Sequence, residues 1–442
     1  MFKKSPVTVP SARQRWRRPN FAWLFWLGGG LAALALIVGG LYLLIQVNDT
    51  AWWYYDSFRA RLRDATFSGS ETLPTVAAPN SAASSAAGST PLPVLASFED
   101  AATTPTPPPT SAPASTPLPT PTPVTFDLVE PPPTALLEGF RFEYQGPSNC
   151  GPTTLAIGLS YWGWQGDQNT VAEILKPRRE DKNVRWDELV YYVRTRAGWL
   201  DSLFRVNGDF AMLELFIANG YPVIIETGYY VDNLWVGHYL LAIGYDRDAQ
   251  ILIVHDATGG PSRRLTYAEV DTLWQHFNRL FILTYPVEDA DKIAYMLGEA
   301  ADEDANRAAA LQRAYDDVQA SPNNAFAWHN LGNNLTYFSR YDEAATAFDR
   351  AREIGLPRRM LFYQFGIYRA YFNVGRYQDV VDLATYTLDY RSELEESYFW
   401  RGWANYMLTG DPVPAIADFN QALTINPNFN DATSALEYFG AR

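Results

Sequence analysis

The chain of 442 residues is 47% hydrophobic and 15% aromatic, so it is long and apolar enough to bury cores in two or three domains. Its formal net charge is -14, although residues 1–20 carry basic side chains and no acidic one. The rest of the chain is therefore strongly acidic. This argues against nucleic acid as a partner, because surfaces that bind nucleic acid are basic.

An uncharged and almost wholly apolar segment, residues 21–47, follows this basic tail. About 20 apolar residues span a bilayer, and the preceding basic cluster places the N-terminus in the cytoplasm. Residues 48–70 would form a juxtamembrane segment, in which the Trp52–Tyr55 run is typical of a membrane interface. A cleaved signal peptide is the alternative, but the apolar stretch is longer than the usual core of one. We therefore predict a transmembrane helix over 21–47 in a single-pass cell-membrane protein, with 1–20 as a cytoplasmic tail and all later domains extracytoplasmic.

Residues 71–135 are rich in proline, threonine, serine and alanine, and they hold 16 of the 30 prolines of the chain. Such a composition offers little apolar surface to bury and cannot offset the entropy lost on ordering. We expect a disordered, extended linker that acts as a semi-rigid spacer.

Residues 136–287 have the pattern of an α+β domain. Helical periodicity predicts helices directly after Cys150 and over residues 169–175, 186–196 and 210–219. Strand-like runs bounded by turn residues then follow at 222–227, 238–245, 251–256 and 281–285. Helices first and an antiparallel sheet after them is the order of elements in papain-like folds.

The chain has one cysteine, Cys150, which excludes an intrachain disulfide as its role. Gly151 and Pro152 follow it and open an amphipathic apolar run. Proline is tolerated in the first turn of a helix, so Cys150 is predicted to lie at a helix N-terminus. The helix dipole and the free N–H groups there favour the thiolate, which is the nucleophilic form.

A cysteine nucleophile needs a general base and a group that orients the base. His238 begins one predicted strand, and Asp256 ends the next, so antiparallel pairing of the two strands would bring them together. The reaction class would be acyl transfer through a thioester. Gln145 could supply an amide N–H to the oxyanion, beside the backbone N–H of Cys150.

The other histidines have structural interpretations. His255 points to the opposite face of its strand from Asp256, and His276 and His329 lie in helical contexts. A metal site built from His238, His255 and Asp256 is disfavoured, because neighbouring strand positions point apart. We expect neither a metal nor a cofactor.

Three motifs together resemble a known family: Gln145 before the Cys150–Pro152 turn, the strand that starts at Gly237–Tyr239, and the strand that ends at Asp256. Over about residues 140–287 they are similar to the papain-like cysteine peptidases, and most closely to the bacteriocin-processing, double-glycine-leader peptidase family and its peptidase-like relatives.

The resemblance implies that Cys150 is the nucleophile, His238 the base, Asp256 its orienting partner and Gln145 part of the oxyanion hole. It also implies a peptide or protein substrate. The exporter-linked members act on the cytoplasmic side and precede an ATPase, whereas this domain is predicted outside the cytoplasm and no ATPase follows it. The family's preference for a Gly-Gly leader is therefore not carried over.

Residues 300–442 are helical in pattern and repeat a helix–turn–helix signature of small and aromatic residues. One copy uses Trp328, Leu331, Gly332, Leu335, Tyr341, Ala344, Phe348 and Ala351; another uses Phe399, Gly402, Tyr406, Ala415, Phe419, Ala422 and Pro427. A weaker copy lies between them. The pattern resembles the tetratricopeptide repeat, which implies a helical solenoid whose concave face binds a protein partner.

The sequence therefore predicts a papain-like cysteine peptidase domain followed by an all-α tetratricopeptide-repeat solenoid, anchored by one N-terminal transmembrane helix. Two alternatives remain open at this point. The domain could be a catalytically inactive peptidase-like binding or scaffold module, or it could be a transglutaminase-like acyl transferase that uses the same three residues.

Overall fold

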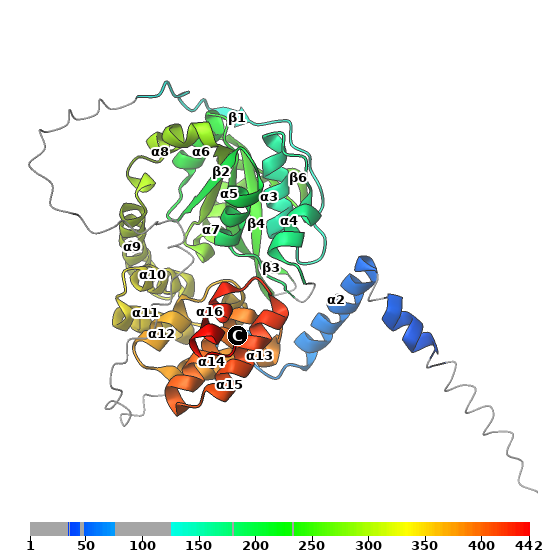
Figure 1. Ribbon diagram of the computed structural model, residues 1–442. Coiled ribbons are helices and arrows are strands. Elements are labelled where there is room, and N and C mark those ends of the chain that lie inside the picture. Colours follow the sequence, from blue (N-terminus) through cyan, green and yellow to red (C-terminus); the bar gives the residue numbers. More distant parts are fainter. Residues whose placement is uncertain (1–33, 35, 45–47, 76–124, 179–180, 232–233) are drawn as a thin grey trace, which may run out of the picture. The chain divides into compact units, whose positions relative to one another are not determined.

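The computed structural model describes residues 34, 36–44, 48–75, 125–178, 181–231 and 234–442, which form two units, Met1–Ser68 and Gly69–Arg442 (Figure 1). In the first unit, helix α2 (Asp49–Thr66) begins after Asn48, whose side chain accepts a hydrogen bond from the Ala51 N–H at 2.9 Å. Most of the predicted membrane span, 21–47, lies outside the described residues. Among the helices that are described, none has the length and apolarity needed to cross a bilayer.

The centre of the second unit is a seven-stranded sheet in which every pairing is antiparallel. Its strands follow the order β2-β7-β3-β4-β5-β6, with β1 paired to β4. The bounds are β1 (Thr134–Leu136), β2 (Leu200–Arg205), β3 (Val223–Val231), β4 (Leu234–Asp246), β5 (Ile251–Asp256), β6 (Gly260–Thr266) and β7 (Phe281–Pro286).

Helices cover both faces of this sheet, and each face has its own hydrophobic core. The core of one face includes residues of α3 and α5, and the core of the other includes residues of α6 and α7. The helices are α3 (Cys150–Tyr161), α4 (Gln168–Leu175), α5 (Trp186–Arg196), α6 (Phe210–Ala218) and α7 (Tyr267–Trp274), followed by the short 3-10 helix η2 (Gln275–Phe277).

The four predicted helices and four predicted strands of this domain are confirmed, with ends shifted by a few residues. The expectation that the helix after Cys150 is amphipathic was wrong. Residues Gly151–Ser160 are all buried, because α3 lies against the sheet and under the surrounding loops and helices. The helix packs closely on the sheet: a Cβ at Gly158 would make an ordinary van der Waals contact with the Leu241 side chain at 3.5 Å.

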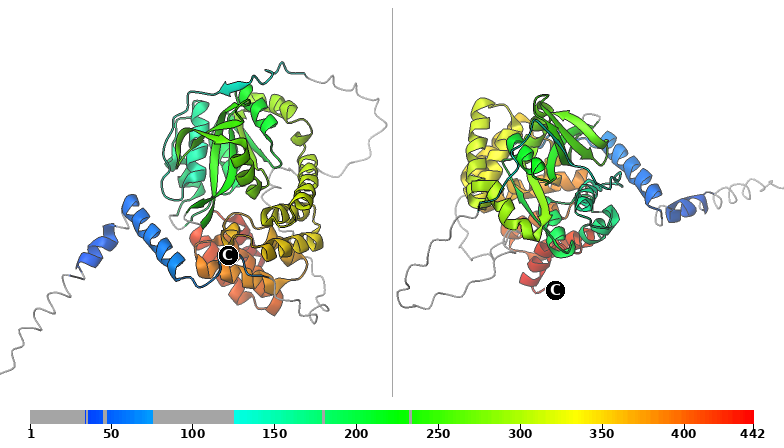
Figure 2. Two further views of the ribbon diagram at one scale, coloured as in Figure 1. Left: turned by 180° about the vertical axis from the view of Figure 1, so that it is seen from behind. Right: turned by 90° about the horizontal axis from the view of Figure 1, so that it is seen from above.

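The C-terminal part of the second unit is helical, as predicted, and its helices pair as successive hairpins α10–α11, α12–α13 and α14–α15 (Figure 2). Small residues allow the close approach: a Cβ at Gly332 would lie 2.7 Å from the Phe348 ring, and one at Gly402 would lie 2.8 Å from Phe419. Assignment of the hairpins to the tetratricopeptide repeat stays a prediction. The bounds are η3 (Val287–Asp289), α8 (Ala290–Leu297), η4 (Gly298–Ala301), α9 (Glu303–Ala320), α10 (Ala325–Tyr337), α11 (Tyr341–Ile354), η5 (Arg358–Phe362), α12 (Gly366–Asn373), α13 (Tyr377–Tyr390), α14 (Glu395–Thr409), α15 (Pro412–Ile425) and α16 (Asn430–Tyr438).

Both ends of the segment predicted as a linker are packed in this unit. Leu73 is buried, and its N–H donates to the Leu356 carbonyl at 2.8 Å, in the turn between α11 and η5. At the other end, β1 pairs with β4. Residues 76–124 lie outside the described part of the chain.

Candidate active site

Cys150 is the first residue of α3 and is half-buried. The loop before it is fixed by a side chain that the sequence analysis did not single out, Gln168 at the start of α4. Its Oε1 accepts hydrogen bonds from the Gly146 N–H at 2.6 Å, the Asn149 side chain at 2.9 Å and the Thr153 hydroxyl at 3.0 Å. One buried amide therefore holds the chain on both sides of the cysteine.

His238 and Asp256 lie on the neighbouring strands β4 and β5, and each is 5% exposed. The His238 Nε2 is 2.8 Å from the Asp256 Oδ1. His238 also interacts with the Cys150 thiol, which contributes to the pKa shifts of both groups. Because Asp256 occupies Nε2, Nδ1 is the ring nitrogen left for the sulfur. Three of the four predicted site residues therefore lie together.

The electrostatics of this chain favour an ion pair between sulfur and imidazole. Burial opposes ionisation of Cys150, but its hydrogen bond with His238 and the nearby positive charges outweigh burial and lower the pKa of the thiol. Burial likewise opposes protonation of His238, but its bonds to Asp256 and Cys150 raise the pKa of the imidazole to about 9. Both shifts act in the direction of a thiolate and an imidazolium.

Asp256 remains a carboxylate because several donors converge on it. Burial opposes its ionisation, but the bond and charge of His238 and the backbone N–H groups of Thr258 and Gly259 lower the pKa of the carboxyl. The Thr258 N–H lies 2.9 Å from Oδ1, and Arg263 on β6 pairs with Oδ2. The sequence analysis missed Arg263, although its place on the strand after the Asp256 turn was a usable signal.

Lys176, at the end of α4, adds a second positive charge near the sulfur. Its Nζ donates to the Ser148 carbonyl at 2.5 Å, two residues before the cysteine. Burial is the main cause that lowers the pKa of Lys176 to about 8, while Asp181 and the Cys150 thiolate act in the opposite direction. Lys176 therefore stabilises the thiolate most strongly below about pH 8, where its amine is protonated.

Gln145, the fourth predicted site residue, is tied to the site through its backbone. Its N–H donates to the Ala257 carbonyl at 2.9 Å, directly after Asp256. Its side-chain Oε1 is buried and has no hydrogen-bond partner among the described residues. No hydrogen bond joins its side chain to Cys150 in that part of the chain.

A buried acid interacts electrostatically with the Cys150 sulfur. Glu226 on β3 is 2% exposed and faces Tyr239 on β4, and its Oε2 has no hydrogen-bond partner among the described residues. Burial and the Cys150 charge raise the pKa of Glu226 well above its usual value, which favours the protonated carboxyl. The Tyr239 hydroxyl donates to the Val184 carbonyl at 3.1 Å, and its backbone N–H donates to the Cys150 sulfur.

The remaining histidines pack away from this chain of residues. The His255 ring lies 5.0 Å from that of Phe140, and its Nδ1 accepts the Ser262 N–H at 3.2 Å. The His276 ring stacks on Phe326 with ring centroids 3.6 Å apart. Burial lowers the pKa values of all three of these histidines, His329 included. Within the described residues, no group of His, Cys, Asp and Glu side chains is arranged to hold a metal ion.

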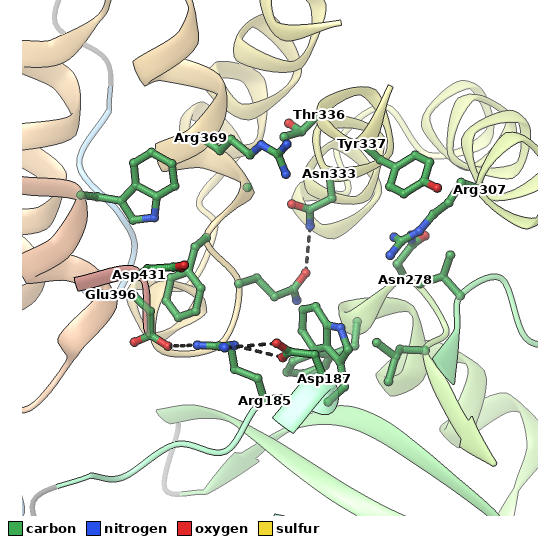
Figure 3. Close-up of a pocket in the computed structure, with 18 of the residues that line it drawn as sticks. Arg185, Asp187, Asn278, Arg307, Asn333, Thr336, Tyr337, Arg369, Glu396 and Asp431 are labelled. Carbon is green, nitrogen blue, oxygen red and sulfur yellow. Dashed lines mark hydrogen bonds and ion pairs between the residues drawn. The ribbon is translucent and has the colours of Figure 1, made fainter. Parts of the chain in front are cut away.

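A separate cavity of about 250 Å³ lies between the sheet domain and the helical region (Figure 3). Its floor carries Arg185, which pairs with Asp187 at 3.0 Å and with Glu396 at 2.8 Å. The second Glu396 oxygen is buried without a partner in the described chain. The other lining residues are Trp186, Val206, Phe277, Asn278, Leu280, Arg307, Asn333, Thr336, Tyr337, Gln364, Phe365, Gly366, Arg369, Phe399, Trp400, Phe429 and Asp431.

Comparison with solved structures lists three peptidases that each align with about a third of this chain. They are a C39-like peptidase from Bacillus anthracis (16% identity, 34% of this chain and 97% of that one, TM-score 0.29) and the peptidase domain of Streptococcus ComA, a bifunctional ABC transporter (17%, 34% and 99%, 0.28). The third is a double glycine motif protease from an AMS/PCAT transporter, solved with its leader peptide (16%, 35% and 99%, 0.25). Among curated proteins, the comparison found no match to this chain.

The model of the Peptidase_C39 like family matches residues 137–282. That range contains Gln145, Cys150, His238 and Asp256. The chain therefore contains a domain similar to the Peptidase_C39 like family, and this is the domain in which the cysteine, histidine and aspartate meet.

Proposed function

We propose that the domain of residues 136–287 is a cysteine peptidase that hydrolyses peptide bonds of a peptide or protein substrate through Cys150, His238 and Asp256. The observation that carries the proposal is that Cys150, at the start of α3, interacts with His238, whose ring is hydrogen-bonded to the Asp256 carboxylate. The family match over the same residues supports it.

In the proposed reaction the Cys150 thiolate attacks the carbonyl carbon of the scissile bond. The imidazolium of His238 then gives its proton to the leaving amine, the C–N bond breaks, and a thioester forms. Water, deprotonated by neutral His238, attacks the thioester and returns the thiolate. Asp256 keeps the imidazole oriented throughout, and Arg263 and Thr258 keep Asp256 charged.

The oxyanion formed on the carbonyl needs donors. The backbone N–H of Cys150 and the side-chain amide of Gln145 are the proposed pair. Support for Gln145 comes from its backbone N–H, which bonds to Ala257 beside Asp256 and so fixes the residue near the site. Its side-chain Oε1 has no hydrogen-bond partner among the described residues that would hold the amide elsewhere.

A peptide carrying a thiol-directed electrophile tests the proposal. We expect Cys150 of the full chain to react at pH 7 faster than a free cysteine thiol does, and Cys150→Ala to abolish both labelling and hydrolysis of a peptide library. A labelling rate equal to that of the free thiol would support the alternative of an inactive scaffold module. Incorporation of an added amine in excess of hydrolysis would indicate the transglutaminase-like transferase instead.

We also propose that the helical region is a tetratricopeptide-repeat array that binds a protein partner. The cavity between the domains supports a peptide ligand, because aromatic walls such as Trp186 and Trp400 alternate there with charges of both signs. Arg369 on its wall forms no ion pair with any described carboxylate. Peptide binding that Trp400→Ala leaves unchanged would count against this cavity as the site.

The membrane anchor is a proposal that rests on the sequence of residues 1–55 alone. It places the peptidase and helical regions outside the cytoplasm, with the N-terminus inside. Extraction of cell membranes with alkaline carbonate tests it, because an integral protein stays in the membrane pellet and a peripheral one is released.

A further inference from the structure

Three consecutive residues of the helical region, Phe362–Gln364, contact the catalytic domain at the C-terminal end of η5. The Phe362 carbonyl accepts a hydrogen bond from the Asn183 side chain at 2.5 Å. The Gln364 amide donates to the His276 carbonyl at 3.0 Å. These two bonds hold the residue between them, Tyr363, against the sheet.

The Tyr363 ring lies in a cluster of aromatic side chains from the catalytic domain. Its centroid is 5.6 Å from that of Trp235 on β4 and 5.8 Å from that of Phe277, and both contacts are edge-to-face. Edge-to-face pairs are favourable at these separations. The position of the tyrosine is thus set by packing as well as by its neighbours in the chain.

Within this cluster, Tyr363 approaches the residue that precedes the catalytic histidine. The backbone of Gly237 interacts with the Tyr363 hydroxyl and opposes the rise in the pKa of the phenol. A Cβ at Gly237 would lie 3.0 Å from Tyr363 Cε1 and 2.7 Å from Phe277 Cζ. Only glycine leaves room for both rings, which accounts for the Gly237-His238 pair in the sequence.

The hydroxyl also lies within electrostatic reach of the nucleophile. Burial raises the pKa of Tyr363 to about 12, and the negative charge of the Cys150 thiolate adds to this effect. The phenol therefore stays protonated near the thiolate. No acceptor for its own proton is found among the described residues.

We propose that Tyr363 is a positioning residue of the catalytic centre, so that the helical region completes the active site of the domain before it. It acts through Gly237, against which its ring packs and whose position sets that of the His238 ring relative to Cys150. This inference rests on the proposed peptidase function, and it adds a functional requirement for a region outside the matched family domain.

The test compares Tyr363→Phe with Tyr368→Phe in the full chain. The first change keeps the ring and removes only the hydroxyl that interacts with the Gly237 backbone. The second removes a buried hydroxyl that bonds to Ser397 at 3.2 Å and to Thr387 at 3.4 Å, wholly within the helical region. The readout is the rate of Cys150 alkylation by iodoacetamide from pH 4 to pH 10, which reports the thiolate without any substrate.

We expect Tyr363→Phe to slow alkylation at pH 6 by about fivefold to tenfold, as for the loss of one hydrogen bond, and to move the acidic limb of the profile to higher pH. Tyr368→Phe should lower thermal stability and leave that limb unchanged. Gly237→Ala, which displaces both rings, should shift the limb in the same direction as Tyr363→Phe.

A wild-type profile in Tyr363→Phe would overturn the inference, and so would equal shifts in both tyrosine variants, because these would indicate general loosening of the fold. Neither result would contradict the proposed peptidase function. That function is contradicted only if the wild-type Cys150 thiol titrates like an ordinary thiol. The two hypotheses can therefore fail separately.

Discussion

In the proposed mechanism His238 acts first as an acid and then as a base. Loss of its positive charge should therefore set the pH at which activity falls on the alkaline side. The proposed mechanism needs imidazolium as the acid for the leaving amine, and its pKa is raised to about 9. We therefore expect peptidase activity to fall as the pH rises past 9, while alkylation of Cys150 does not fall, because alkylation needs only the thiolate.

The variant Asp256→Asn tests the same role of His238. Removing the carboxylate removes a cause of the raised His238 pKa, so the alkaline limb of activity should move to lower pH. Measured rates of peptide hydrolysis from pH 6 to pH 10 check both statements. Activity that keeps rising above pH 9 in the wild type would contradict the role of His238 as the acid.

Part of the site could be predicted from the sequence at the level of single residues. Cys150 was recognisable from the Gly-Pro helix start, and Asp256 from the end of its strand. His238 was predicted to begin a strand, but β4 starts earlier, at Leu234, so His238 lies inside it. Lys176, Glu226 and Tyr363 were not, because their approach to the sulfur depends on how distant segments pack. An acid in a strand or a tyrosine in a helical repeat has no local pattern that marks it as a neighbour of the nucleophile.

At the scale of elements, a buried ion pair joins the start of α5 to α14. Arg185 immediately precedes α5, and its side chain is 10% exposed; that of Glu396, with which it pairs at 2.8 Å, is 6% exposed. Breaking such a pair leaves a buried charge uncompensated and costs about 3–5 kcal/mol. Arg185→Met should therefore lower the free energy of unfolding by about that much in urea denaturation.

Arg340→Met is the control, because it breaks an ion pair with Glu343 whose two side chains are 40% and 56% exposed. An exposed pair contributes at most about 1 kcal/mol. If the two variants differed by less than about 1 kcal/mol, the buried pair would not be a main link between the two regions.

Two strands that the sequence analysis did not predict, β6 and β2, lie at the two edges of the sheet. β6 is the edge strand of the sheet, and most of its residues are exposed, so it lacks the apolar alternation that marks a strand. β2 is the opposite edge, and it carries Asp201, Ser202 and Arg205. The central strands were predictable because they are buried on both faces, and the helical hairpins because their small and aromatic residues recur at a fixed spacing.

For the whole molecule, the packed segment of residues 69–75 changes the meaning of the proline-rich region. The chain is fixed to the helical region at Leu73 and enters the sheet at β1. Residues 76–124 therefore join two points of one folded unit. If residues 21–47 anchor the chain as proposed, residues 76–124 do not separate that anchor from the point at which the folded unit begins.

Hydrogen exchange measures whether this contact holds in solution. The Leu73 N–H bonds to Leu356, the Ser70 carbonyl accepts from Arg358 at 2.9 Å, and the Pro74 carbonyl accepts from Arg352 at 2.8 Å. We expect the Leu73 amide to be protected in the intact chain. Leu73→Ala removes a buried side chain at a cost of about 2–5 kcal/mol and should reduce this protection on the order of a hundredfold.

Thr75→Ala provides the comparison, because Thr75 lies two residues further on and is exposed, so its loss should leave the protection of Leu73 unchanged. Protection at α3 should stay the same in both variants, since Leu73 packs on the helical region. Exchange of the wild-type Leu73 amide at the rate of an open backbone would mean that the segment is detached. The proline-rich region would then be free to act as the spacer that its composition suggests, between the peptidase-like domain and the proposed membrane anchor.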